Sequence, residues 1–306
     1  MNAPFGGLVS RLSPVHASFI NVISFAPTGE LLVGGCGYAH TVQIWSHEGG
    51  EPRAVLHGHS NHVSSLSFSL DGRLLLSGDL DGHLLLIDMD SFSVVGEIHV
   101  GLGAIRGIAF ITQDIVVISC GKGVVSTWSI RSLMEVNRKM ISNTSINALV
   151  VDSARSHIAL ACGDGIIRML SLPSQDHLSQ LIGHEGSVNS IQFNYDGRII
   201  ASGGSDETVR LWNAEGSTAI STLGSCEDAV QSISFHPTAP LLASGVLRGE
   251  YPITIWDLES RSPTSIADSK LDEVSSISFS PNGHLLACAG NGRTSEVEVW
   301  RIDVRS

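Results

Sequence analysis

Apolar residues recur along this chain of 306 residues at a nearly constant interval. All five tryptophans fall on one set of equivalent positions, and Ile87 and Leu170 complete the set at steps of 41 to 44 residues. The seven positions are Trp45, Ile87, Trp128, Leu170, Trp212, Trp256 and Trp300, and we call them the tryptophan register. A constant interval of this length indicates one small structural unit repeated seven times.

A second set of apolar positions, the phenylalanine register, lies 18 to 21 residues before the first. Its members are Phe25, Phe68, Phe110, Val151, Phe193, Phe235 and Phe279. An aliphatic residue precedes each member by two positions, and a β-branched residue precedes it by five. Because unrelated apolar clusters would drift out of phase, the agreement of these sets favours seven copies of one unit.

The fifth unit, residues 183–223, predicts four short strands separated by turns. The expected strands are 188–193, 198–202, 208–212 and 218–223, with turn-forming pairs such as Asp196-Gly197 between them. No stretch of the chain shows sustained helical periodicity. Four strands per unit, repeated seven times, predict an all-β fold, a seven-bladed β-propeller of four-stranded antiparallel blades.

The repeat boundaries predict a single domain over 1–306, with units at 16–56, 57–99, 100–140, 141–182, 183–223, 224–267 and 268–306. The seventh unit ends shortly after Trp300 and lacks a fourth strand. A strand-like segment at 7–12 precedes the first unit. We therefore expect residues 7–12 to form the outer strand of the last blade and to close the ring.

The fifth unit also carries polar residues at characteristic positions: Gly183-His184, Ser202, Asp206 and Trp212. On these residues, and on the pair Trp256-Asp257, the chain resembles the WD-repeat β-propellers. The resemblance implies that His184, Ser202, Asp206 and Trp212 form a hydrogen-bonded chain inside their blade. Only His16 and His59 share the histidine position, and only Asp81 and Asp164 share the aspartate position. The network is therefore expected to be complete in the fifth blade and partial elsewhere.

The net charge and the sequence motifs exclude several classes of function. The net charge is −12 and no basic run is present, which argues against direct nucleic-acid binding. No membrane span, no signal peptide and no paired cysteine spacing is visible, so a cytoplasmic or nuclear protein is expected. No catalytic or cofactor-binding motif appears, and His57, His59 and His62 are better explained by the repeat than by a metal site. The chain is therefore expected to be non-enzymatic, without cofactor or catalytic residues.

One set of polar positions points to a partner surface. It lies five residues after the histidine position, directly after a β-branched residue in each unit. Its members, which we call the rim residues, are Asn21, Ser64, Arg106, Asn147, Asn189, Gln231 and Ser275. In WD-repeat propellers the matching position lines the mouth of the central channel, where partner peptides dock. The alternative is that these strands simply face water in the channel; Arg106 is the one cation among them.

Long loops point to a second partner surface. The interval between the phenylalanine and tryptophan registers is longest in units six, seven and one, through extra residues at 246–252, 290–294 and 35–40. These units are neighbours in a closed ring, so the loops are expected side by side on one face. They carry Tyr38, Arg248, Tyr251 and Arg293, residue types that dominate protein interfaces. The alternative is neutral variation in loop length.

These observations predict a non-catalytic scaffold, a monomeric propeller that holds other proteins or their peptide segments within a hetero-complex. A second hypothesis is the substrate receptor of a ubiquitin ligase. Receptors of that type often carry Trp-Asp-x-Arg, but Glu259 follows Trp256-Asp257-Leu258 here. A third hypothesis, a propeller enzyme, would need carboxylates or histidines among the rim residues, and there are none.

Overall fold

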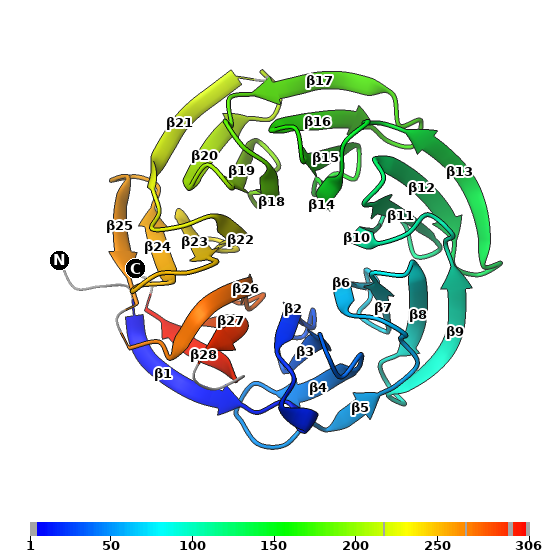
Figure 1. Ribbon diagram of the computed structural model, residues 1–306, viewed down its shortest axis with the longest axis horizontal. Helices are drawn as coiled ribbons and strands as arrows, with labels where there is room; N and C mark the ends of the chain where they lie inside the picture. The colour runs from blue at the N-terminus through cyan, green and yellow to red at the C-terminus, as the bar shows by residue number, and fades with distance from the viewer. Residues whose placement is uncertain (1–4, 217, 267, 293–295, 304–306) are drawn as a thin grey trace.

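The protein is a ring of seven four-stranded antiparallel sheets around a central channel (Figure 1). The computed structural model describes residues 5–216, 218–266, 268–292 and 296–303. Within these ranges there is one helical segment, the 3-10 turn η1 (Val15–Ala17). No helix among them is long and apolar enough to cross a membrane. The predicted fold class and number of blades are confirmed.

In the first six blades the strands run outward from the channel in chain order. Blade one holds β2 (Ile20–Phe25), β3 (Leu31–Cys36), β4 (Val42–Ser46) and β5 (Ala54–Leu56); blade two holds β6 (Val63–Phe68), β7 (Leu74–Asp79), β8 (His83–Asp88) and β9 (Ser93–His99). Blade three holds β10 (Ile105–Phe110), β11 (Ile115–Cys120), β12 (Val124–Ser129) and β13 (Met134–Met140); blade four holds β14 (Ile146–Val151), β15 (His157–Cys162), β16 (Ile166–Ser171) and β17 (His177–Ile182). Blade five holds β18 (Val188–Phe193), β19 (Ile199–Gly204), β20 (Thr208–Asn213) and β21 (Thr218–Ser225); blade six holds β22 (Val230–Phe235), β23 (Leu241–Val246), β24 (Ile253–Asp257) and β25 (Ser262–Ser265).

Blade seven is built from both ends of the chain. Its strands β26 (Leu271–Phe279), β27 (Leu285–Gly292) and β28 (Val297–Ile302) are completed by β1 (Phe5–Leu12), which pairs antiparallel with β28. Leu8 pairs with Trp300 and Leu12 with Val297, and the Leu12 side chain is fully buried. In Figure 1, β1 lies along the outer edge of this blade. The predicted closure of the ring by an N-terminal strand is confirmed.

The core consists of apolar layers between neighbouring blades rather than one central cluster. One layer joins Trp45 and Phe25 of blade one to Ala287 and Val299 of blade seven. Close approach of the sheets explains the small residues near the ends of the second strands. A Cβ atom on Gly78, for example, would lie 2.7 Å from the Cγ2 atom of Ile105 in the next blade, so only glycine fits there.

The predicted hydrogen-bonded chain is present in blade five. Nδ1 of His184 lies 2.9 Å from Asp206, its Nε2 lies 2.7 Å from Oγ of Ser202, and the indole N–H of Trp212 donates to the same Oγ at 2.8 Å. Asp206 also accepts the backbone N–H of Glu185 at 3.0 Å, which fixes the loop before β18. All four side chains are therefore tied together inside one sheet.

Blade two has a related network, but it contains Asp79 and not Asp81, the aspartate that the sequence placed there. His59 lies 2.7 Å from Oγ of Ser77 and 3.1 Å from Asp79, whereas Asp81 binds Ser60 and Asn61 on the surface. Asp79 ends β7 at the position that Gly204 has in blade five. In blade five a Cβ atom on Gly204 would lie 2.6 Å from the Asp206 carboxylate. An aspartate carboxylate therefore occupies the same space in both blades. It comes from the end of the second strand in blade two and from the following turn in blade five.

Candidate functional site: the mouth of the channel

The rim residues lie near the beginnings of the innermost strands, and these strands line the channel in Figure 1, so the rim residues share one end of it. Five of the seven line a single cavity of about 350 Å³, which is the candidate interaction site: Asn21, Ser64, Arg106, Gln231 and Ser275. The other two, Asn147 and Asn189, occupy the same position in blades four and five. The cavity draws residues from blades one, two, three, six and seven, so the intact ring is required to form it.

Most rim side chains have a role that neither sequence hypothesis included, because they bind the next blade. Each donates a hydrogen bond to the backbone carbonyl of the β-branched residue that begins the neighbouring inner strand or lies near its start. The bonds are Asn21 to Val63 (3.1 Å), Ser64 to Ile105 (2.6 Å), Asn147 to Val188 (2.8 Å), Asn189 to Val230 (3.1 Å) and Ser275 to Ile20 (2.7 Å). The polarity of these positions therefore stabilises the ring as well as facing the channel.

Arg106 differs from these five residues. Its side chain is exposed, and no hydrogen bond or ion pair holds it among the described residues. Glu273 lines the same cavity, but its carboxylate lies 3.9 Å from Arg248, a residue that is 78% exposed. An exposed pair at that distance is weak, since water screens both charges. Arg106 is thus left as a cation at the channel mouth with its donors open to solvent.

Aromatic rings border the cavity on the side of blades one and two. Tyr38 is 74% exposed and packs edge-to-face on Phe19, with ring centroids 4.8 Å apart, and on His62 at 5.4 Å. Phe19 and His62 themselves line the cavity. Because two rings already hold Tyr38 in one orientation, its exposed face can contact a partner with little further loss of conformational entropy.

The long loops of blades six and seven also reach the channel mouth, because Leu247, Gly290 and Asn291 line the cavity. Tyr251 is 38% exposed, and its backbone N–H donates to Glu227 at 3.2 Å. Arg293 lies outside the described residues. The structure therefore brings the rim and the loops of blades six and seven to one surface, which the sequence treated as two separate sites.

Two side-chain clusters could suggest chemistry. In the described part of the chain, His59, Asp79 and His83 bring ligand atoms within 4.8 Å of one another, as a metal site would require. Both ring nitrogens of His59 are, however, already bonded to Asp79 and Ser77, and Asp79 accepts the backbone N–H of His83. Burial opposes ionisation of Asp79, but the His59 bond and the backbone N–H groups outweigh it and hold the pKa at about 2. These side chains fit the blade network rather than an ion.

A serine, a histidine and an aspartate meet on the opposite side of the ring, at the turn after β14. Oγ of Ser156 and a carboxylate oxygen of Asp152 both lie 3.0 Å from Nδ1 of His157. Activation of a serine nucleophile requires the serine and the aspartate to bind opposite nitrogens of the imidazole ring. In this arrangement the three side chains brace a turn instead.

Comparison with known proteins agrees with this architecture. A family model described as "WD domain, G-beta repeat" matches residues 8–46, 50–88, 175–213 and 264–300, which together make up half of the chain. The chain belongs to this WD-repeat family. Each matched segment ends at the tryptophan register or one residue beyond it, as repeats of a propeller should.

Individual WD-repeat relatives align over short stretches. Small ribosomal subunit protein RACK1 of Drosophila melanogaster is 28% identical over 76 residues, which is 24% of each chain. The human WD repeat and SOCS box-containing protein 1 is 30% identical over 80 residues, covering 26% of this chain and 19% of its own. The periodic tryptophan protein 2 homolog of Schizosaccharomyces pombe is 34% identical over 85 residues, 28% of this chain and 10% of its own. The chain thus spans about a quarter or less of these relatives, and the family supports a protein-interaction propeller in general terms.

Proposed function

We propose that this WD-repeat protein is a non-catalytic scaffold whose channel-mouth surface binds a segment of another protein. The observation that carries this proposal is the state of the rim. Five rim side chains are bonded to neighbouring blades, whereas Arg106 is exposed at the edge of a 350 Å³ cavity without an ion pair in the described ranges. A rigid ring with an open cation at its channel mouth suits recognition of an acidic or phosphorylated segment.

The cavity size and its borders set the scale of this contact. A volume of about 350 Å³ accommodates a few side chains, not a folded domain. Tyr38, Phe19 and His62 on one side and Leu247 on the other provide apolar contact area, and Arg106 provides the charge.

Affinity purification from the native cell, followed by mass spectrometry, tests the proposal. We expect stoichiometric partners with the wild-type chain, loss of at least one partner with Arg106→Glu, and retention of that partner with Arg131→Glu. Arg131 is a matched control because it is exposed on the same blade, in the turn between β12 and β13 at the opposite face. Partners that survive both substitutions equally would show that the channel mouth is not the contact surface.

The same experiment separates the alternatives. The matched SOCS-box relative keeps the ligase-receptor hypothesis open, and cullin-type companions would favour it over the scaffold. A chain that purifies alone and turns over a substrate would favour an enzyme.

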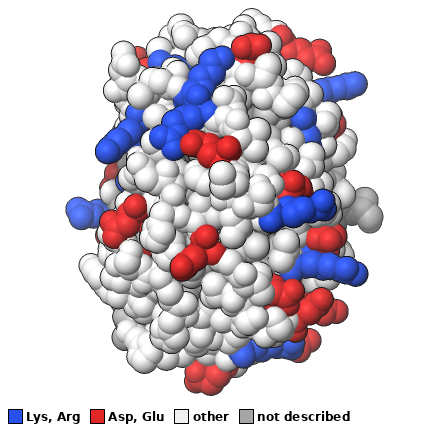
Figure 2. All heavy atoms as spheres, turned by 90° about the vertical axis from the view of Figure 1, so that its right-hand side faces the viewer, with Lys and Arg blue, Asp and Glu red and all other residues white. Residues whose placement is uncertain are grey.

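We further propose a monomeric propeller inside a hetero-complex in the cytoplasm or nucleus, without direct contact to nucleic acid. The net charge of −12 supports the last point. Figure 2 shows basic and acidic side chains interspersed over the outer side of the ring near blades two and three, with no large basic area on that side. Salt-dependent retention of the purified protein on DNA or RNA would contradict this expectation.

A further inference from the structure

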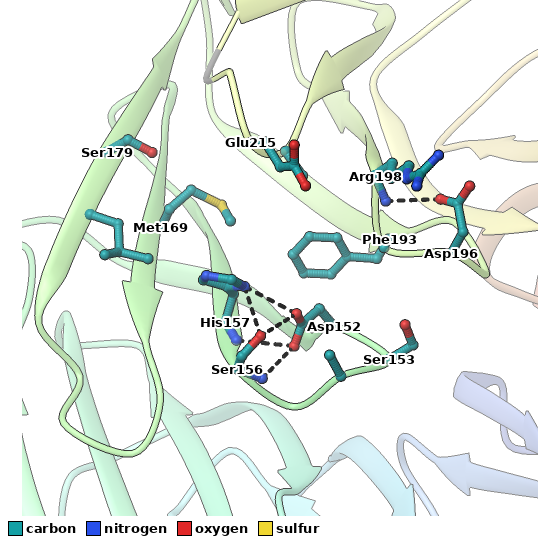
Figure 3. A pocket seen from close by; sticks show the side chains of 14 residues that line it. Asp152, Ser153, Ser156, His157, Met169, Ser179, Phe193, Asp196, Arg198 and Glu215 are labelled. Carbon is teal, nitrogen blue, oxygen red and sulfur yellow. Dashed lines mark hydrogen bonds and ion pairs between the residues drawn. The ribbon is translucent and has the colours of Figure 1, made fainter.

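A second cavity, independent of the channel mouth, lies between blades four and five on the opposite face of the ring. It has a volume of about 500 Å³ and is formed by the turns after β14 and β18, the turn after β20, and strands β16 and β17. Figure 3 shows His157, Met169 and Ser179 of blade four on one side and Phe193, Arg198 and Glu215 of blade five on the other. We call it the blade 4–5 groove.

Blade six shows how a side chain can fill the corresponding place between two blades. In blade six, His236 follows the phenylalanine register and inserts between blades, where its Nε2 lies 3.0 Å from the carbonyl of Gly283 in blade seven. The equivalent residue of blade four is Asp152. Its carboxylate turns back into its own turn and accepts the backbone N–H groups of Ser156 (2.7 Å) and His157 (3.0 Å). No ring therefore fills the space beside blade five.

The outer part of blade four is bonded to blade three. The turn between β16 and β17 is tied to blade three, since the fully buried Gln175 donates to Oγ1 of Thr127 at 2.5 Å. Lys139 of blade three donates to the Gln175 carbonyl at 2.9 Å. Leu178, just after this turn, is left 52% exposed at the groove wall.

The groove has an apolar floor and a wall rich in hydrogen-bond acceptors. Met169, Phe193 and Ala214 supply the apolar surface. Asp196 and Glu215 line the wall: Asp196 uses one oxygen to accept the N–H of Arg198 at 2.9 Å, and the Glu215 carboxylate has no partner among the described residues. Nδ1 of His157 lies 3.0 Å from the Asp152 carboxylate; in the tautomer that donates this bond, Nε2 is an acceptor. The lining holds three carboxylates, of which that of Asp152 is bound within its own turn, and one guanidinium, that of Arg198.

We propose that the blade 4–5 groove holds a lysine or arginine side chain from an extended segment of a partner protein. The aliphatic stem of such a side chain would lie on Met169 and Phe193, and its cationic head would donate to the unpartnered carboxylate of Glu215. A volume of about 500 Å³ fits this side chain and its neighbours in an extended segment. The acidic excess of the wall disfavours an anionic ligand at the same place.

The test follows the methyl signal of Met169 by NMR on the full chain with 13C-labelled methionine. The probes are four pools of acetylated hexapeptides with a fixed central Lys, Arg, norleucine or Glu and mixed Ala, Leu, Ser and Tyr elsewhere. The Lys and Arg pools are expected to shift the Met169 signal in a saturable way, at least about fivefold more tightly than the norleucine pool. Met89, buried in blade two, serves as the internal control.

Two substitutions without a structural role in the fold sharpen the result. Glu215→Gln should weaken the Lys pool at least about fivefold, whereas Glu259→Gln, an exposed acid in the corresponding turn of blade six, should leave it unchanged. A Glu or norleucine pool that binds as tightly as the Lys pool would overturn the proposal. Absence of any Met169 shift at millimolar peptide would overturn it equally. Neither outcome bears on Arg106, so the channel-mouth function stands or falls separately.

Discussion

Blades five and seven meet the same requirement with different chemistry. Each buries a tryptophan whose indole N–H needs an acceptor, and each must hold the loop that enters its innermost strand. In blade five, Trp212 donates to Ser202, and Asp206 holds the loop through the N–H of Glu185. In blade seven, one buried carboxylate, Glu298, does both.

The Glu298 network is the more concentrated of the two. Its carboxylate is 1% exposed and accepts the indole N–H of Trp300 (3.2 Å), Oγ–H of Ser269 (2.8 Å), the N–H of Lys270 (2.9 Å) and Nη2–H of Arg11 (3.3 Å). Arg11 lies on β1. The network that replaces the family pattern in this blade therefore also fastens the strand that closes the ring.

The comparison shows that both blades supply an acceptor for the indole N–H at the same place, but from different positions in the sequence. A buried donor must find an acceptor, because leaving it unpaired is unfavourable by about 1–3 kcal/mol. The acceptor can come from the second strand, as Ser202 does, or from the third strand, as Glu298 does. Only the third-strand solution in blade seven couples the indole to ring closure.

Removal of residues 1–13 should lower the stability of the protein more than any other change considered for these two blades. It deletes β1, exposes the edge of β28, removes the fully buried Leu12 and takes away the Arg11 partner of Glu298. We expect the melting temperature to fall by more than about 10 °C in a thermal unfolding scan. An unchanged melting temperature would show that blade seven holds together without its outer strand.

Glu298→Ala should have the next largest effect, since it leaves four donors without their acceptor. The expected loss is about 3 kcal/mol in the free energy of unfolding, measured by urea denaturation. Glu298→Gln keeps one carbonyl oxygen and the side-chain volume, so a loss of about half that size is expected. Equal stability of the Ala variant and the wild type would mean that the carboxylate contributes nothing net to closure.

Much of the fold was predictable because it rests on apolar periodicity. The phenylalanine and tryptophan registers located the blades, and the short segment at 7–12 located the closing strand. The acceptors of the indole N–H groups were less predictable. A side chain two residues before the tryptophan register can reach the place that Ser202 occupies in blade five. Ser126 and Glu298 stand there as buried acceptors of the indole N–H, and Gln43, buried at the same position, binds Val15 instead. Buried polar residues at this position are a signal the sequence already contained.

The candidate site was predictable only in part. The sequence showed that the rim residues are polar. It could not show their hydrogen bonds to the next blade, because the acceptors are backbone carbonyl groups, which every residue has. Spacing favoured Asp81 as the aspartate of blade two, whereas in the structure Asp79, at the end of β7, bonds His59. The blade 4–5 groove was not predicted, because its lining residues come from turns and strands of two blades and share no sequence pattern.

Paired tryptophan substitutions should give a smaller difference. Trp45 and Trp212 are both buried, but the indole nitrogen of Trp45 has no hydrogen-bond partner in the described part of the chain. Trp212→Phe should therefore be more destabilising than Trp45→Phe by about 1 kcal/mol in urea denaturation. Equal losses would indicate that the bond to Ser202 is without net value and that burial alone explains both residues.

The pH dependence of stability should give the smallest effect, and it belongs to blade five. Burial lowers the pKa of His184 below its ordinary value of 6.5, although the Asp206 bond opposes the shift. The unfolded chain therefore binds a proton at a higher pH than the folded chain does. The stabilisation is complete above pH 6.5 and is lost as the pH falls towards the folded pKa, by at most about 1.4 kcal/mol per pH unit.

Urea denaturation at pH 7.5 and 5.5 measures this effect. His184→Gln removes the titrating group, so its difference in unfolding free energy between the two pH values should be smaller than that of the wild type. Trp45→Phe is the control, because it alters a buried side chain in a blade where no histidine joins the indole, and its pH difference should match the wild type. A His184→Gln variant with the full wild-type difference would place the pH sensitivity in another histidine. His236 is the first alternative, since burial lowers its pKa as well, and the blade-five network would then be held by Asp206 and Ser202 without a titrating contribution at these pH values.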